Sequence, residues 1–209
     1  MSSLKYHVLW PEAIVVYPDG LKTTIPLYDP EGLKTGWQVG PGFNDDRDLK
    51  FFDAMLASLR KDYHVDDKRI YVTGHSNGGS FTYALWAARG PVIAAVAPTS
   101  AAAALVLSQL TPKPASIVGG TNDQIVKFPW QQSTIDAVLK LNECGAGQPA
   151  GTNITAYPSP TGNPLVTYIY PGNHTPPPTV APLIVKFFRD GAASLSGALP
   201  PASQSPKAP

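Results

Sequence analysis

The feature that most constrains this chain is a very short connection between an expected strand and an expected helix. Ile70–Thr73 (IYVT) is a β-branched and aromatic run that indicates a buried strand, and Gly79–Arg89 has the apolar residues of a helix. Only Gly74-His75-Ser76-Asn77-Gly78 lies between them. Because so tight a turn brings strand and helix together, the residues flanking Ser76 must be small. We therefore expect Ser76 in a strained backbone conformation with its hydroxyl exposed.

Further along the chain, short apolar runs alternate with helical patterns. Additional strands are expected at Ala13–Tyr17, Val92–Ala97, Ala115–Val118 and Leu165–Tyr170, and additional helices at Asp45–Tyr63, Gln131–Leu141 and Ala181–Arg189. Leu21–Asn44 is rich in Gly, Pro and polar residues and is expected to form a long loop. Since each strand is nearly all apolar, the pattern predicts an α/β fold: a mostly parallel sheet with helices on both faces.

Composition and charge exclude several classes of protein. The chain has 209 residues and a net charge of +1, which favours one domain and gives no general reason to bind nucleic acid or an anionic membrane. No apolar run approaches the roughly 20 residues of a membrane helix, and residues 1–10 do not resemble a signal peptide. The single Cys144 has no intrachain partner, and no Cys/His cluster or phosphate loop appears, so neither metal nor cofactor is expected. We expect one domain over residues 1–190 and a disordered Pro/Ala/Ser tail over 191–209.

Ser76 needs a base, because a serine hydroxyl is a poor nucleophile until its proton is removed. His174 follows the last expected strand and Asp123 follows the strand Ala115–Val118, so both belong to the carboxyl edge of the sheet. The chain order serine, aspartate, histidine is that of one known hydrolase arrangement. Asp19 is a weaker alternative carboxylate, while a turn-capping Asp123 and an ordinary loop histidine at 174 remain open.

These residues predict acyl transfer. Ser76 attacks a carbonyl, His174 accepts its proton and Asp123 orients the imidazole. The backbone N–H of Asn77 is expected to stabilise the oxyanion. Trp37 and Gln38 in the long loop, His75 beside Ser76, and Trp130 are candidates to bind substrate, although such a tryptophan more often packs a loop onto the body.

Several strings resemble the polyhydroxybutyrate depolymerase/feruloyl esterase group of α/β-hydrolases. They are WPEAIVVYPDGL from Trp10, GWQ from Gly36, DLKFFDAMLASLRKDYHVDDKRIYVTGHSNGG from Asp48, GGTND from Gly119 and APLIVKFF from Ala181. The resemblance implies the α/β-hydrolase fold and a triad at Ser76, Asp123 and His174. It also implies hydrolysis of small or polymeric carboxylic esters (hydroxyalkanoate polyesters, feruloyl or acetyl esters) and an extracellular location.

The chain departs from that group near its beginning. The group carries a further strand ending in His-Gly, whose loop gives a second oxyanion donor and which lies between the strands matching Ala13–Tyr17 and Ile70–Thr73. We expect this chain to lack the N-terminal strands of the fold, since Tyr6–Trp10 is too near Ala13 for a parallel crossover. Two rival functions therefore stay open: a catalytically impaired, truncated scaffold, and a prolyl-peptidase-like serine peptidase.

Overall fold

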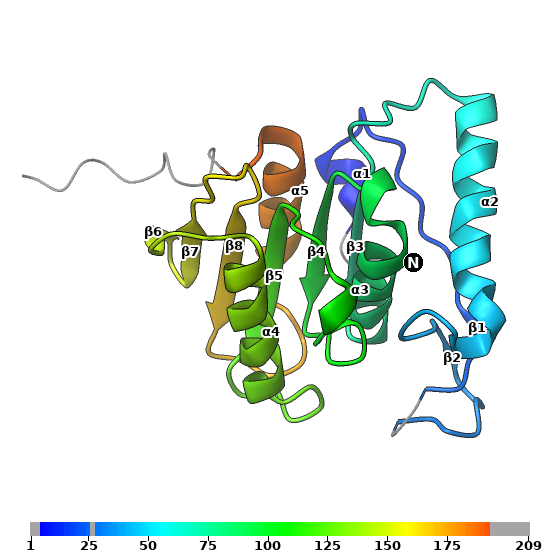
Figure 1. Cartoon of the computed structure of the whole chain (residues 1–209), viewed down its shortest axis with the longest axis horizontal. Coiled ribbons are helices and arrows are strands. Elements are labelled where there is room, and N and C mark those ends of the chain that lie inside the picture. The colour runs from blue at the N-terminus through cyan, green and yellow to red at the C-terminus, as the bar shows by residue number, and fades with distance from the viewer. Residues whose placement is uncertain (1–4, 26–27, 193–209) are drawn as a thin grey trace, which may run out of the picture.

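A six-stranded, mostly parallel sheet runs through the computed structural model, which describes residues 5–25 and 28–192 (Figure 1). In spatial order its strands are β3 (Tyr71–His75), β4 (Ala95–Thr99), β5 (Ala115–Gly120), β8 (Leu165–Tyr170), β7 (Ile154–Tyr157) and β6 (Gln148–Gly151). The first four strands are parallel to one another, and β7 and β6 add an antiparallel hairpin. The carboxyl ends of β3, β5 and β8 therefore lie at one edge.

Helices cover both faces of this sheet, as the sequence predicts (Figure 1). One face packs against α3 (Asn77–Arg89) and α4 (Phe128–Leu141), and the other against α5 (Val180–Asp190). Apolar residues of α2 (Arg47–Asp62) join the same cluster as α3. Successive residues of a strand point to opposite faces of the sheet. In β4, Val96 packs on the face that α3 and α4 cover, whereas Ala95 and Ala97 pack on the face that α5 covers. Because both faces are covered, β4, β5 and β8 are buried at nearly every position and are mostly apolar.

Apart from Ala13–Tyr17, the predicted elements reappear, most of them with shifted bounds, and several short ones are new. The strand at Leu165–Tyr170 has the predicted limits. The new elements are α1 (Tyr6–Leu9), β1 (Leu21–Lys22), β2 (Thr35–Gly36), η1 (Phe43–Asp46), η2 (Gly90–Val92), η3 (Leu107–Gln109) and the β6–β7 hairpin. In β6 the sequence QPAG contains proline and glycine, which weaken any strand signal. An edge strand tolerates them because it pairs on one side only.

The prediction of a strand at Ala13–Tyr17 is wrong. This segment follows α1 and has no strand assignment, and Ile14 and Val16 are 48% and 42% exposed. Its β-branched residues favour an extended backbone, but a strand also needs a hydrogen-bonded neighbour. Among the described residues it has none, and a cavity separates it from β3.

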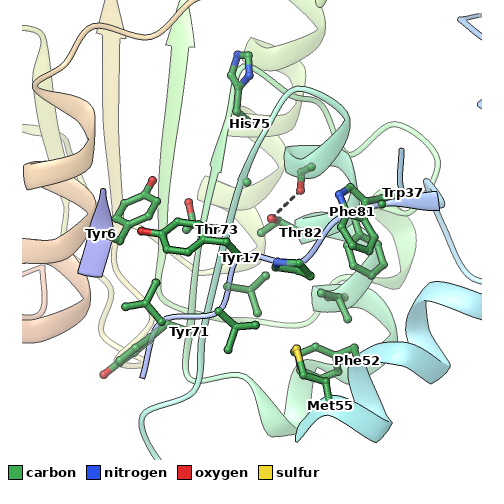
Figure 2. A pocket seen from close by; sticks show the side chains of 18 of the residues that line it. Tyr6, Tyr17, Trp37, Phe52, Met55, Tyr71, Thr73, His75, Phe81 and Thr82 are labelled. Carbon is green, nitrogen blue, oxygen red and sulfur yellow. Dashed lines mark hydrogen bonds between the residues drawn. The ribbon is translucent and has the colours of Figure 1, made fainter. Parts of the chain in front are cut away.

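The cavity is about 930 Å³ and lies along the outer edge of β3 (Figure 2). Residues from α1, the Ala13–Gly20 segment, α2 and α3 also line it. On the other edge of β3, the Ser76 N–H donates to Thr99 and the Ile70 carbonyl accepts from Ala94. Since backbone groups alternate sides along a strand, those of Tyr71, Thr73 and His75 point toward the cavity.

The predicted tail at residues 191–209 lies, apart from its first two residues, outside the described part of the chain. Within residues 5–25 and 28–192, no helix has the length and apolar character needed to span a bilayer.

The open edge of β3 leads to a prediction about hydrogen exchange. We expect the amide hydrogens of Tyr71, Thr73 and His75 to exchange faster than those of Val72 and Gly74, because only the latter pair face β4. Residue-resolved exchange on isotopically labelled protein measures this. Equal protection of odd and even positions would mean that the outer edge is covered in solution.

Candidate active site

Ser76 occupies a strained turn between β3 and α3. Its φ and ψ are 56° and −120°, and its N–H donates to the Thr99 carbonyl at 2.9 Å. A Cβ on Gly74 would lie 2.3 Å from the Gly78 oxygen, and one on Gly79 would lie 2.6 Å from the Ala101 Cβ. A Cβ on Gly78 would meet nothing within 4 Å. The steric requirement therefore falls on Gly74 and Gly79 rather than on the last glycine of the motif.

His174 lies in the loop between β8 and α5, and its ring lies between the side chains of Ser76 and Asp123. Its Nε2 is 2.7 Å from the Ser76 Oγ, and its Nδ1 is 2.8 Å from the Asp123 Oδ2. A carboxylate can only accept, so Nδ1 carries the ring proton and Nε2 is free to accept from the hydroxyl. The His174 side chain is 16% exposed, and that of Asp123 is fully buried. The partner of His174 is thus Asp123, not the exposed Asp19.

Asp123 is a buried carboxylate surrounded by donors. Its Oδ1 accepts from the N–H groups of Ile125 and Val126 at 2.9 and 3.0 Å, and its Oδ2 also accepts from the Gln131 Nε2 at 3.1 Å. Burial of a charge is costly unless hydrogen bonds compensate for the lost water, and these donors do so. The loop after β5 therefore presents a fixed acceptor to His174.

The sequence analysis missed the role of Gln131. This residue is fully buried on α4 and bonds both Asp123 and the Val126 carbonyl. A signal was present: Gln131 precedes Ile135 and Val138 at spacings of four and seven, which places an amide on the buried stripe of the helix. A polar side chain at such a position needs a buried partner.

Asn77 is the first residue of α3, and its backbone N–H lies where a helix leaves donors without an internal partner. The Asn77 side chain is used differently. Its Oδ1 accepts from the Trp37 N–H at 2.7 Å, and its Nδ2 donates to the Trp37 carbonyl at 2.9 Å. These two bonds tie the long loop to the Ser76 turn.

The predicted substrate-binding residues have different surroundings. Trp37 stacks on Phe81, with ring centroids 5.1 Å apart, and lines the cavity beside β3. Trp130 is 54% exposed, with the Lys127 ammonium 5.8 Å from its ring centroid. The His75 ring bonds the His174 carbonyl at 2.8 Å and points away from the apolar residues of the cavity (Figure 2).

For Gln38 the structure argues against the predicted contact with substrate. Its side chain is fully buried, and its Oε1 accepts from the N–H groups of Asp48 and Leu49 at the start of α2. Its Nε2 donates to the Gly40 carbonyl and to Asp46. The Oε1 therefore caps α2, because the first N–H groups of a helix need external acceptors, while the Nε2 bonds the loop that precedes the helix.

Curated proteins similar to this chain are esterases. The bifunctional acetylxylan esterase/xylanase of Neocallimastix patriciarum is 32% identical over 116 residues, which are 55% of this chain and 15% of that protein. Feruloyl esterase D of Neurospora crassa is 26% identical over 162 residues, which are 70% of this chain and 52% of that protein. Feruloyl esterase C of Emericella nidulans is 28% identical over 155 residues, which are 69% of this chain and 55% of that protein. The chain spans about half the length, or less, of these relatives, and no family model matches it.

Solved structures show the same fold. A point variant of Arabidopsis thaliana SOBER1 superposes with a TM-score of 0.58 at 15% identity, over 84% of this chain and 83% of that one. The acetyl xylan esterase of Aspergillus awamori superposes with a TM-score of 0.51 at 14% identity, over 68% of this chain and 69% of that one. The chain has the α/β-hydrolase fold and is homologous to acetylxylan and feruloyl esterases. These matches do not support the polyhydroxybutyrate depolymerase part of the resemblance.

The capping role of Gln38 predicts a loss of stability upon its replacement. We expect Gln38→Leu to lower the free energy of unfolding by about 1–3 kcal/mol, because it leaves buried donors of α2 unsatisfied. Urea denaturation followed by circular dichroism measures this, with Gln132→Leu on the surface of α4 as the matched control. An unchanged denaturation midpoint together with a raised KM for an ester would instead indicate a substrate contact.

Proposed function

We propose that this chain is a serine carboxylic-ester hydrolase that cleaves acetyl or feruloyl esters through an acyl-enzyme. Ser76 acts as the nucleophile, His174 as the general base and acid, and Asp123 as the carboxylate that orients it. The coarser part of this proposal, ester hydrolysis, is supported by homology to named esterases. The roles of the individual residues are supported by their geometry.

One observation carries the assignment of roles. A single imidazole, that of His174, is hydrogen-bonded on one side to a serine hydroxyl and on the other to a buried carboxylate, at 2.7 and 2.8 Å. Both distances suit proton transfer, and the buried carboxylate stabilises the imidazolium that forms when the hydroxyl proton moves.

In the first half of the reaction, the Ser76 Oγ bonds to the ester carbonyl carbon while its proton passes to the His174 Nε2. The carbonyl π electrons move onto oxygen, where the Asn77 N–H and the N-terminal end of α3 stabilise the charge. When the tetrahedral intermediate collapses, the bond to the alcohol oxygen breaks. The leaving alcohol takes the proton from His174, and the acyl group stays on Ser76.

In the second half, water replaces the alcohol. His174 removes a proton from the water, whose oxygen bonds to the acyl carbon. The intermediate then expels the Ser76 oxygen, which recovers its proton from His174. The products are a carboxylic acid and the free enzyme, and every proton is returned without metal or cofactor.

The proposed substrates follow the relatives rather than the site alone. Acetyl and feruloyl esters occur in the names of the matched proteins, whereas hydroxyalkanoate polyesters enter only through the sequence resemblance. The acetyl group is small and the feruloyl group is aromatic, so the two need different amounts of apolar surface in the binding site. We also propose that the protein acts outside the cell, on the ground of its resemblance to this group of esterases.

A second candidate is a catalytically impaired scaffold, and the open edge of β3 favours it. The turn that holds Ser76 follows β3, which in the described part of the chain pairs with β4 on one side and borders the cavity on the other. Loss of one oxyanion donor costs on the order of 10²–10³ in rate. In such a scaffold the triad geometry persists while turnover is slow.

The central test is the hydrolysis of p-nitrophenyl acetate by the 209-residue chain and its variants. We expect Ser76→Ala, His174→Gln and Asp123→Asn to lower kcat by on the order of 10⁴–10⁶, because the three groups act as a unit. Ser58→Ala, a change at an exposed serine of α2, serves as the control. Equal rates for wild type and Ser76→Ala would refute the nucleophile. A folded wild type that neither hydrolyses the ester nor reacts with a fluorophosphonate would favour the impaired scaffold.

A comparison of an ester with an amide separates the esterase from a serine peptidase. With methyl ferulate and the matching feruloyl amide, and with acetyl-prolyl p-nitroanilide as a peptidase probe, we expect turnover of the ester alone. Homology to esterases is the reason for this expectation. Hydrolysis of the anilide at a rate comparable to that of the ester would overturn it, and the ratio of kcat/KM for acetyl and feruloyl esters ranks the two proposed acyl groups.

A further inference from the structure

The loop that carries His174 is held by donors from three different parts of the fold. Three consecutive carbonyls accept hydrogen bonds: Gly172 from the Asn122 N–H at 2.9 Å, Asn173 from the Tyr170 hydroxyl at 2.9 Å, and His174 from the His75 ring at 2.8 Å. Asn122 belongs to the loop of Asp123, and Tyr170 ends β8. Among the described residues, His75 alone connects the main chain of residue 174 to β3.

His75 lies at the end of β3, directly before Ser76, and is half-buried. Its ring centroid is 4.7 Å from that of His174, and the two planes are tilted by 50°. The Nε2 faces a carbonyl oxygen, which can only accept, so Nε2 carries a hydrogen. Burial lowers the pKa of the His75 imidazole below its ordinary value, so the ring is neutral at neutral pH and donates without adding charge beside His174.

Two successive residues of one rigid turn therefore contact His174 in two ways. The Ser76 hydroxyl meets its ring, and the His75 ring meets its carbonyl. The backbone at Ser76 is fixed by Thr99 and by the close packing of Gly74 and Gly79. A donor anchored there holds the main chain of the histidine in a fixed relation to the nucleophile.

We propose that His75 is a positioning residue, which sets the reach of the His174 imidazole to the Ser76 hydroxyl by clamping the His174 carbonyl to the end of β3. This inference rests on the proposed function and replaces the expectation that His75 touches substrate. A displacement of about 1 Å in a catalytic group can cost roughly 10²-fold in rate. The clamp acts on the proton transfer and leaves substrate affinity alone.

The test uses two replacements that differ in their ability to donate. His75→Phe keeps an aromatic ring in the same space but has no donor, whereas the amide of His75→Gln can donate to the His174 carbonyl. With p-nitrophenyl acetate, we expect His75→Phe to lower kcat by roughly 10- to 100-fold with KM within about twofold. We expect His75→Gln to recover most of this loss. The rate of Ser76 labelling by a fluorophosphonate should follow the same order, because it too needs the base but does not need turnover.

Controls keep the outcomes separate. His64→Phe makes the same change at an exposed histidine and should leave kcat unchanged. Thermal melting of each variant identifies a general loss of folding. If His75→Phe raises KM at constant kcat, His75 contacts substrate and the inference is overturned. If His75→Phe matches wild type, or His75→Gln is as slow as His75→Phe, the clamp is also overturned. Failure of the proposed function is distinct, because it appears without any change at His75: either wild-type activity survives Ser76→Ala, or the wild type shows neither ester hydrolysis nor labelling by a fluorophosphonate.

Discussion

The close approach of two backbones at the Ser76 turn is the constraint on which the rest of the site depends. Gly74 lies so near the Gly78 carbonyl, and Gly79 so near Ala101, that any side chain at either glycine would push strand and helix apart. The positive φ of Ser76 follows from this contact and points its hydroxyl toward the carboxyl edge of the sheet. The same contact brings the start of α3, whose first N–H groups have no partner within the helix, beside the nucleophile.

Parallel strands deliver the remaining groups to that edge. Asp123 follows β5 and His174 follows β8, and these two strands are neighbours in the sheet, so residues 51 positions apart meet at 2.8 Å. Hydrogen bonds then remove the freedom that two loops would otherwise keep. Donors from Ile125, Val126 and Gln131 fix the carboxylate. Three successive carbonyls of the histidine loop accept from other donors. The Asp123 loop is thus tied to α4, and the His174 loop is tied to the Asp123 loop and to β3.

The local sequence pattern predicted some strands of the fold correctly and failed for others. Leu165–Tyr170 was predicted with its observed limits because a central parallel strand is apolar on both faces. Ala13–Tyr17 has an equally strong β pattern but is not a strand, since a cavity separates it from β3 and it pairs with no other described segment. The hairpin of β6 and β7 escaped prediction because Pro149 and Gly151 mask it. Propensity describes what a segment favours, whereas pairing depends on what lies next to it.

By itself, the sequence determined the α/β class, the sharp turn at Ser76, and Asp123 and His174 as the partners to expect, because spacing and steric size act locally along the chain. The tertiary structure alone decided that Gln38 caps α2, that Gln131 supports Asp123 and that His75 holds the His174 carbonyl. Each of these is a buried or half-buried polar side chain whose partner lies on another segment of the chain. A hydrogen bond is set by distance in space, and no local pattern in the sequence records which segments fold to within 3 Å of one another.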